Sequence, residues 1–352
     1  MIEESFIKSF QDQIVTWQQQ HGRHQLPWQQ QSSPYHVLVS ELMLQQTQVI
    51  TVIPYFERWM IKFPTIERLA AASTDEVMAA WQGLGYYARA RNLHKAAQYI
   101  TALGVFPQSL AELLAVPGVG RYTAGAIMSF AYNAYGPIVD GNVRRFYARY
   151  FAIDGVTTSS AVDKKLWALA EQLTPQDNCR SFAQGLLDLG ATICKPRQPL
   201  CEQCPVASSC QALAQNRVDT LPTAKPKKVI PTKAGHFLWI ERQQQLYLEL
   251  RPAVGIWPSL WALPELTLPP LPQQIPQQSV AKRGQFLHQF SHYKLEASVW
   301  QASADAIHQV QQTGSGRWFS LAELAEVGLP APIRAFITAQ LQLAAEHCSI
   351  QD

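Results

Sequence analysis

Residues 114–124 read Leu114-Ala115-Val116-Pro117-Gly118-Val119-Gly120-Arg121-Tyr122-Thr123-Ala124. Two closely spaced glycines between apolar segments predict a helix, a tight turn and a second helix. The glycines would let backbone N–H groups at the start of the second helix approach an anion closely. Such a hairpin would hold a phosphate without reading bases. A purely structural turn between two helices accounts for the same residues, so the hairpin alone does not decide the function.

Upstream of this hairpin, an acidic residue falls within an apolar helix. Ser33 and Pro34 predict an N-cap and a first-turn proline for a helix that runs to about Gln48. Glu41 lies near the middle of the apolar face of that helix, which is formed by Val37, Leu38, Leu42, Leu44 and Val49. No Lys or Arg occurs between residues 34 and 56, so burial would raise the pKa of this carboxyl. Glu41 is therefore a candidate proton donor near neutral pH, and the alternative is a core glutamate hydrogen-bonded to a distant residue.

Downstream of the hairpin, a second carboxyl is predicted to start a helix. The segment Val139-Asp140-Gly141-Asn142-Val143-Arg144-Arg145 places Asp140 where it can cap that helix. Capping is a sufficient structural explanation for this residue and is also compatible with function. We expect a carboxylate that accepts backbone N–H bonds to stay ionised, the opposite of Glu41. One acid and one anion match the chemistry of glycosidic-bond cleavage.

Four cysteines follow one another closely near residue 200. Cys194, Cys201, Cys204 and Cys210 are separated by six, two and five residues. This uneven spacing within one loop favours a 4Fe–4S cluster. A four-cysteine zinc site is the alternative, although such sites usually contain two C-x2-C pairs. Lys195 and Arg197 lie between the first two cysteines, which suggests a structural role for the cluster in presenting a phosphate contact.

Composition and patterning predict two domains. The chain has 352 residues, a net charge of +3 and 47% apolar residues. Residues 1–218 are almost entirely helical in pattern, residues 219–233 are typical of a linker, and residues 234–352 predict an α+β domain. In that second domain we expect strands over 235–250, 257–263 and 295–301, and helices over 321–324 and 332–343. No apolar run is long enough for a membrane span, and the acidic first residues do not form a secretory signal.

Together these motifs resemble the helix-hairpin-helix DNA glycosylases, and more narrowly the MutY-type adenine DNA glycosylases. The match is carried by residues 40–49, by Gly83-Leu84-Gly85-Tyr86-Tyr87-Ala88-Arg89, by residues 114–124 and 139–145, and by the four-cysteine loop over 194–210. It covers residues 1–218 densely and the second domain more thinly. The resemblance implies a helical helix-hairpin-helix glycosylase domain with one 4Fe–4S cluster, joined by the linker to a Nudix-like domain.

The resemblance also implies an activity. The family flips adenine that is mispaired with 8-oxoguanine or guanine out of the duplex and hydrolyses its glycosidic bond. Glu41 would protonate adenine N7, Asp140 would stabilise the sugar cation, and Tyr122 and Asn142 would assist. The related endonuclease III-type enzymes carry a lysine where this chain has Tyr122. Because a phenol cannot form a Schiff base, we expect a monofunctional glycosylase without efficient lyase activity.

Further residues match positions of the family that contact DNA or the lesion. Gln46, Leu84 and Tyr86 match positions that wedge into the base stack. Phe290-Ser291-His292 resembles the loop that senses 8-oxoguanine. The alternative for Phe290 is a purely structural role as a core aromatic residue. The expected contacts with DNA or the lesion are Gln46, Thr47, Leu84, Tyr86, Arg89, Gly118, Gly120, Lys195, Arg197, Phe290, Ser291 and His292. After Gly255 the second domain has only Glu265 where a Nudix hydrolase carries a glutamate-rich metal box. We therefore expect this domain to recognise the lesion and not to hydrolyse nucleotides.

Three alternatives to adenine excision would each need different residues. A non-catalytic DNA-binding redox sensor would need neither Glu41 nor Asp140. A bifunctional lyase would need a lysine in place of Tyr122. A nucleotide-pool hydrolase would need the glutamate-rich metal box. We expect a cytoplasmic, nucleoid-associated monomer whose partner is double-stranded DNA with A:8-oxoguanine or A:G mispairs, with no membrane partner.

Overall fold

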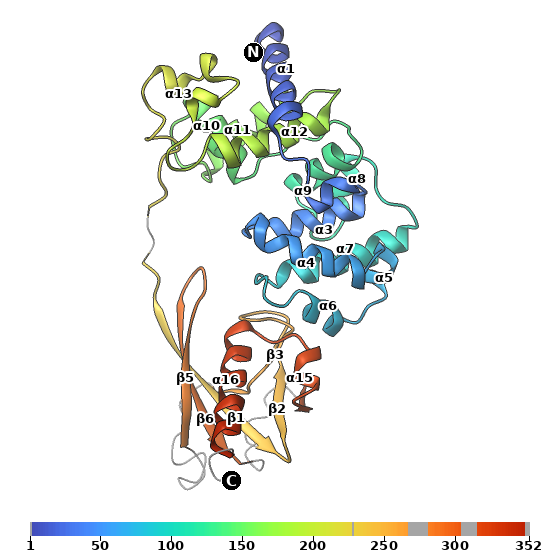
Figure 1. The fold of residues 1–352 in the computed structure, drawn as a ribbon, viewed down its shortest axis with the longest axis vertical. Helices are drawn as coiled ribbons and strands as arrows, with labels where there is room; N and C mark the ends of the chain where they lie inside the picture. The colour runs from blue at the N-terminus through green and yellow to red at the C-terminus, as the bar shows by residue number, and fades with distance from the viewer. Residues whose placement is uncertain (1, 227–228, 267–280, 304–314, 349–352) are drawn as a thin grey trace. The chain divides into compact units, whose positions relative to one another are not determined.

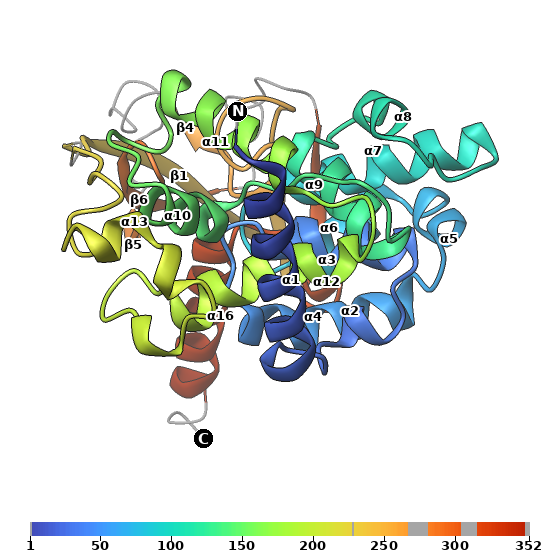
Figure 2. The same ribbon diagram turned by 90° about the horizontal axis from the view of Figure 1, so that it is seen from above.

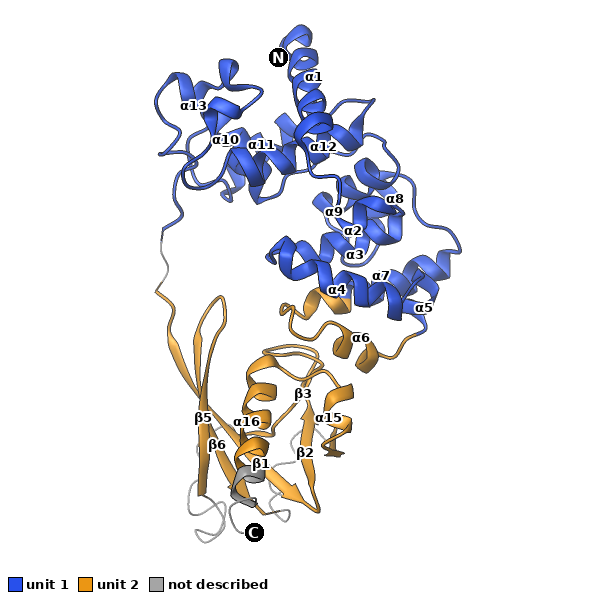
Figure 3. Ribbon diagram, viewed as in Figure 1, with its two compact units in different colours: residues 1–71, 92–227 blue, residues 72–91, 228–352 orange. Residues whose placement is uncertain are grey.

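The computed structural model describes residues 2–226, 229–266, 281–303 and 315–348. Packing divides the chain into two compact units, one of residues 1–71 with 92–227 and the other of residues 72–91 with 228–352 (Figure 3). The domain ranges drawn from the sequence, 1–218 and 234–352 with a linker at 219–233, remain a prediction, and the division by packing differs from them at residues 72–91. Residues 227–228 of that linker lie outside the described part of the chain.

The first unit is helical (Figure 1). Its N-terminal helices are α1 (Glu4–His21), α2 (Pro27–Gln30), α3 (Pro34–Leu44), α4 (Val49–Lys62) and α5 (Ile66–Ala70). Helix α7 (Ala88–Leu103) crosses from the second unit into the first, and α8 (Leu110–Ala115), α9 (Arg121–Ala126), η1 (Ile127–Ala131), α10 (Gly141–Tyr150) and α11 (Ser160–Leu173) follow it. The unit ends with α12 (Cys179–Asp188), η2 (Leu189–Ile193), η3 (Cys201–Gln203), η4 (Ala207–Ser209) and α13 (Gln211–Ala214).

Two long-range contacts organise this unit around the predicted active-site residues. Helix α1 lies against α12, although the two are separated by most of the unit in sequence (Figure 2). Helix α3 packs against both α4 and α9, which brings the helix of Glu41 beside the helix of Tyr122. Both η1 and η2 are π-helical segments, which are frequent at functional sites.

The second unit combines a mixed sheet with helices. Its elements are α6 (Thr74–Ala80), β1 (Thr232–Arg242), β2 (Gln245–Leu250), β3 (Trp261–Ala262), β4 (Glu265–Leu266), β5 (Ala281–Gln289), β6 (Lys294–Ala302), β7 (Gly316–Ser320), α15 (Glu323–Glu326) and α16 (Ala331–Cys348). Within the described residues the sheet order is β3-β2-β1-β6-β5, with β4 paired to β1 and β7 paired to β2. Strands β1 and β6 are parallel, with Phe237 opposite Val299. This α+β architecture confirms the predicted fold class of the second domain.

The strands predicted from the sequence are present in this unit, but further strands were not predicted. The expected strands over 235–250, 257–263 and 295–301 correspond to β1 with β2, β3 and β6. Strands β4, β5 and β7 were not expected. β5 alternates between exposed and half-buried positions and carries no strongly apolar face, so the alternation that marks a strand is weak there. In the described part of the chain, none of the helices has the length and apolar composition that crossing a membrane requires.

Candidate active site

Glu41 is buried and hydrogen-bonded to a tyrosine from the hairpin. Its side chain is 4% exposed, and the Tyr122 hydroxyl donates to Glu41 Oε2 at 2.7 Å. Burial raises the pKa of Glu41 to about 7, while the bond from Tyr122 lowers it and the nearby charge of Asp140 raises it. Burial also raises the pKa of Tyr122 well above its usual value, so the phenol stays a neutral donor. The expected burial and raised pKa of Glu41 are thus confirmed.

The helix of Glu41 is shorter than its sequence pattern suggested. Helix α3 ends at Leu44 and not near Gln48, because Gln45 leaves the helical region with a ψ of 112° and Gln46 then adopts a positive φ of 57°. Val49 consequently begins helix α4 and is not part of the apolar face of α3. The turn between the two helices presents Gln46 as an exposed residue, with Thr47 partly buried beside it.

Asp140 caps helix α10 as predicted, but its titration differs from the expectation. Its Oδ1 accepts the backbone N–H of Val143 at 2.7 Å, and its Oδ2 accepts Asn142 Nδ2 at 3.0 Å. Burial nevertheless raises the pKa of Asp140 above its usual value, and these hydrogen bonds and the charge of Arg145 only oppose that shift. Desolvation therefore outweighs the cap, and the pKa of Asp140 shifts in the same direction as that of Glu41 and not in the opposite direction. That Asp140 stays ionised at neutral pH remains a prediction.

Arg145 connects this carboxyl to the cysteine loop. Its guanidinium donates from Nη2 to Asn142 Oδ1 at 2.9 Å and to the Gly190 carbonyl at 2.6 Å, and from Nε to the Cys194 carbonyl at 2.8 Å. Gly190 allows the close approach of the two segments, since a Cβ there would lie 2.6 Å from Asn142 Cβ. Asp140 and Asn142 at the N-terminus of α10 and the start of the cysteine loop are thus held in one polar network.

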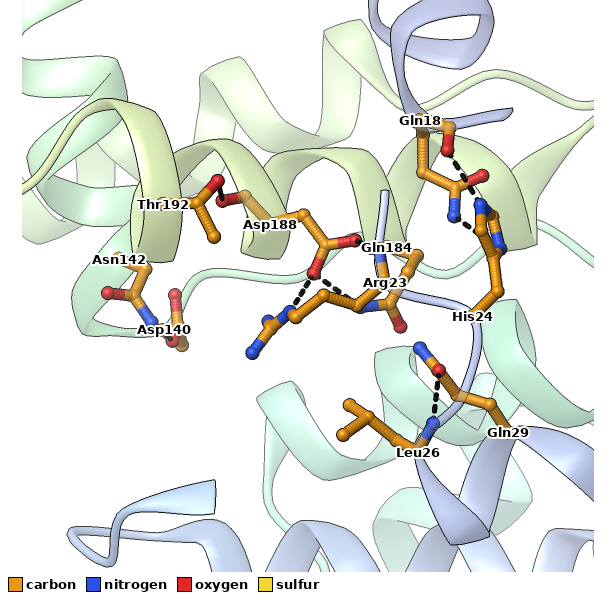
Figure 4. A network of polar contacts seen from close by, with 10 residues as sticks. All are labelled: Gln18, Arg23, His24, Leu26, Gln29, Asp140, Asn142, Gln184, Asp188 and Thr192. Atoms are coloured by element: carbon orange, nitrogen blue, oxygen red, sulfur yellow. Dashed lines mark hydrogen bonds and ion pairs between the residues drawn. The ribbon is translucent and has the colours of Figure 1, made fainter. Parts of the chain in front are cut away.

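A cavity of about 340 Å³ opens onto Glu41. Its walls include Trp28, Phe130, His24, Gln29 and Gln184, none of which the sequence analysis identified. Behind it, Asp188 is 1% exposed and accepts the backbone N–H and Nε of Arg23 at 2.9 and 2.7 Å (Figure 4). Asp188 Oδ1 also accepts Gln184 Nε2 at 3.0 Å. Gln184 and Asp188 lie one helical turn apart, which is only a weak sequence signal for a polar pair. Arg23, the other partner of Asp188, lies 165 residues away in sequence.

The four cysteines gather around one small apolar pocket. Cys194, Cys201, Cys204 and Cys210 line it together with the rings of Phe146 and Tyr150. Arg149 is 3% exposed and donates to Cys194 Sγ at 3.4 Å and to the Lys195 carbonyl at 2.8 Å. A buried cation beside four sulfurs suits an anionic group. Among the described residues, no three His, Cys, Asp or Glu side chains converge on a single ion. A cubane does not require such convergence, because each thiolate binds a different iron.

The comparisons with known proteins agree with this geometry. Residues 39–172 match the HhH-GPD superfamily of base excision DNA repair proteins, and residues 236–339 match the NUDIX domain. The adenine DNA glycosylase of Buchnera aphidicola subsp. Acyrthosiphon pisum (strain APS) is 34% identical over 337 residues, which cover 93% of this chain and 96% of that protein. The Homo sapiens adenine DNA glycosylase is 33% identical over 389 residues, which cover 90% of this chain and 71% of that protein. The chain belongs to the adenine DNA glycosylase family.

As an adenine DNA glycosylase family member, the chain is a DNA N-glycosylase of base excision repair. A thermostable thymine-DNA glycosylase of known structure superposes with a TM-score of 0.53 at 31% identity, covering 59% of this chain and 97% of that one. An endonuclease III–DNA complex superposes with a TM-score of 0.50 at 21% identity and covers 61% of this chain and 99% of that one. The second likeness extends to the fold alone. The predicted helix-hairpin-helix glycosylase fold with a Nudix-like second domain is confirmed.

The predicted hairpin of this family member is present. Helices α8 and α9 flank a turn in which Gly118 has a φ of +80°, and Gly120 is the N-cap of α9. A Cβ at Gly118 would lie 2.5 Å from Asn92 Cβ, whereas nothing lies within 4 Å of one at Gly120. In the cysteine loop, Lys195 is half-buried and Arg197 is exposed.

The other predicted DNA contacts differ in exposure. Tyr86 is 53% exposed, whereas Leu84 is 6% exposed and Arg89 is 7% exposed. The Arg89 guanidinium donates to the carbonyls of Leu84 and Gly85, so in this structure it supports the loop from within.

The predicted sensing loop lies at the turn between β5 and β6. Ser291 and His292 are exposed there. Phe290 is half-buried against the rings of His288 and Tyr293 at 4.5 and 4.8 Å.

Proposed function

We propose that this chain flips adenine out of A:8-oxoguanine and A:G mispairs and removes it by hydrolysis. The observation that carries the proposal is the buried Glu41 carboxyl, which accepts the Tyr122 hydroxyl at 2.7 Å and opens onto the cavity. A purine base would enter that cavity from double-stranded DNA. The protein would act as a monomer on such duplexes.

Glu41 supplies the proton that makes adenine a leaving group. Because its pKa is about 7, a large fraction of the carboxyl is protonated at neutral pH. With Oε2 already accepting from Tyr122, the proton resides on Oε1 and passes to adenine N7. The glycosidic bond then breaks with its electron pair leaving on adenine. The Asp140 carboxylate, oriented by Asn142, stabilises the sugar cation. Water adds to that cation and gives a proton to the Glu41 carboxylate, which completes the abasic site and restores the acid.

The Asp188 network supports adenine as the base that is accepted. Gln184 lines the cavity and donates its amide nitrogen to Asp188, so its amide oxygen is the group that would accept a hydrogen bond from a bound base. An oxygen acceptor pairs with the exocyclic amine of adenine and opposes the O6 carbonyl of guanine. This orientation of Gln184 favours adenine over guanine.

We also propose that the enzyme is monofunctional. Lyase chemistry needs an amine that attacks the sugar. Tyr122 occupies the hairpin position where a lysine would serve, and no lysine is among the described residues that line the cavity. The product would be an intact strand with an abasic site.

One 4Fe–4S cluster held by Cys194, Cys201, Cys204 and Cys210 would complete the first unit. The apolar pocket and the buried Arg149 support this assignment over zinc, whose four thiolates would have to converge on one ion. When bound, the cluster would hold the loop of Lys195 and Arg197 in place for a phosphate. Cys201→Ser should lose most of the bound iron, and an unchanged iron content would overturn the assignment.

A single-turnover assay tests the function directly. A labelled duplex with adenine opposite 8-oxoguanine is incubated with excess enzyme, and each sample is divided, with and without hot alkali. Strand breaks after alkali alone would support monofunctional excision, and breaks without alkali would indicate a lyase. Glu41→Gln should slow excision by at least about 10²-fold while mismatch binding persists. Glu57→Gln, an exposed glutamate of α4, is the matched control. Full activity of Glu41→Gln would contradict the acid role.

A further inference from the structure

Residues 72–91 belong by packing to the unit that contains residues 228–352 (Figure 3). This segment carries the loop Gly83-Leu84-Gly85-Tyr86. We propose that the second domain is a positioning device for this loop, acting through Tyr87 and Arg91, and that it sets the geometry with which Tyr86 enters the base stack. The inference rests on the proposed function and adds positioning residues to it.

Two polar contacts hold the chain directly after the loop. The Tyr87 hydroxyl donates to the Leu329 carbonyl at 3.1 Å, in a buried position 242 residues away in sequence. Arg91 Nη1 donates to the Pro258 carbonyl at 2.7 Å. Because Tyr87 follows Tyr86 immediately and Arg91 is one turn further along α7, both bonds restrain the same end of the loop.

Apolar packing joins the rest of the segment to the same domain. Met78 is 1% exposed, and Gly328 lies so close that a Cβ there would be 2.6 Å from Met78 Cβ. At the start of α6, the Trp261 indole N–H donates to Asp75 Oδ1 at 3.3 Å. Helix α6 also contacts α15. Met78, Asp75 and helix α6 thus all contact residues of the second domain.

The loop is also supported on its inner side, which leaves Tyr86 as the group that it presents. Trp81 Nε1 donates to the Gly85 carbonyl at 3.0 Å, and Arg89 Nη2 donates to the Leu84 and Gly85 carbonyls at 3.2 and 3.3 Å. Tyr86 has a φ of +48° and is 53% exposed, with the Arg89 guanidinium 5.3 Å from its ring centre. A non-glycine residue with positive φ persists where surrounding contacts impose it. The contacts at residues 258 and 329 are part of that constraint.

The test measures base extrusion separately from chemistry, in the full-length protein. Tyr87→Phe removes the hydroxyl and keeps the buried ring. Tyr132→Phe is the matched control, since that hydroxyl also donates to a carbonyl, that of Pro107, at 2.9 Å. Extrusion is followed by the fluorescence of 2-aminopurine placed beside the target adenine. We expect Tyr87→Phe to slow both the fluorescence rise and excision by about three- to tenfold, because this is the effect of losing one hydrogen bond. Arg91→Met, a half-buried position, should do the same if Tyr87→Phe fails to fold.

A second substrate distinguishes positioning from a general structural defect. In a duplex already unstacked by an abasic site next to the target adenine, the wedge is not needed, so both variants should recover the rate of the unaltered protein. Equal losses on both duplexes, or an unchanged fluorescence rise, would overturn the positioning role. Absence of adenine excision by the unaltered protein would instead refute the proposed function.

Discussion

At the residue scale, Glu41 can act as an acid only while its carboxyl holds a proton. With a pKa of about 7, its protonated fraction falls about tenfold per pH unit above neutrality. Asp140 must be ionised, and its raised pKa moves the acidic limb of activity to higher pH than an ordinary aspartate would. A bell-shaped dependence of excision on pH follows.

Tyr122→Phe should move the alkaline limb of that profile. The tyrosine hydroxyl lowers the pKa of Glu41 by donating to its carboxylate, so its removal should raise this pKa and shift the limb to higher pH. Single-turnover rates from about pH 5 to about pH 9 measure the shift. Tyr135→Phe, whose hydroxyl donates to the Glu171 carbonyl, serves as the control. A shift to lower pH would mean that Tyr122 does not stabilise the anionic form.

At the element scale, the hairpin and the start of α10 depend on close backbone approaches. Gly118 makes the turn between α8 and α9 possible because of its positive φ and its proximity to Asn92. Gly190 lets η2 approach α10 closely enough for Arg145 to bridge them.

Gly118→Ala should weaken DNA binding by about tenfold. A side chain at a φ of +80° costs about 1–2 kcal/mol, and its Cβ would also overlap Asn92. Gly104→Ala is the control, because Gly104 also has a positive φ, of +71°, and the substitution creates the same backbone strain. An added Cβ at Gly104 would have no atom within 4 Å, and this residue lies outside the hairpin. Titration of a labelled duplex compares the two variants. Equal affinities would argue that the hairpin turn does not contact the phosphate.

Arg145→Met should lower excision by about ten- to a hundredfold, since it removes charged hydrogen bonds to Asn142, Gly190 and Cys194. Arg144→Met, on the same helix, loses bonds to Thr157 and Asp163 instead and should retain excision. Single-turnover rates and iron content are measured together. A normal rate in Arg145→Met would show that Asp140 needs no support from this network.

At the scale of the whole molecule, the residues proposed for catalysis and those proposed for lesion recognition lie in different units. The first holds the cavity, Glu41, Asp140 and the cysteine pocket. The second holds the loop of Tyr86 and the turn of Ser291 and His292. Neither unit matches one continuous stretch of sequence, because residues 72–91 pack with the C-terminal part of the chain.

Ser291→Ala combined with His292→Ala should reduce the preference for 8-oxoguanine over guanine opposite adenine by about three- to tenfold per lost hydrogen bond. Both side chains are exposed and available to a base. Excision rates on the two mispairs give the ratio. Gln289→Ala, exposed on the same hairpin, is the control. A preserved ratio would remove this turn from lesion recognition.

Local signals in the sequence were sufficient for much of this protein. The apolar face around Glu41, the N-caps Ser33 and Asp140, the glycine turn at Gly118 and the change of pattern after the linker all depend on neighbouring residues. Such features are dictated by periodicity and backbone geometry. They were enough to predict the fold class and the burial of the acid.

Only the tertiary structure decided which distant groups meet. The bond between Glu41 and Tyr122 spans 81 residues, and the bond between Arg23 and Asp188 spans 165. Burial of Asp140 raises its pKa, whereas its cap alone would lower it. Residues 72–91 pack with the second unit, in part through the hydrogen bonds of Tyr87 and Arg91. Desolvation and long-range contact are properties of the folded chain, so no local pattern reports them.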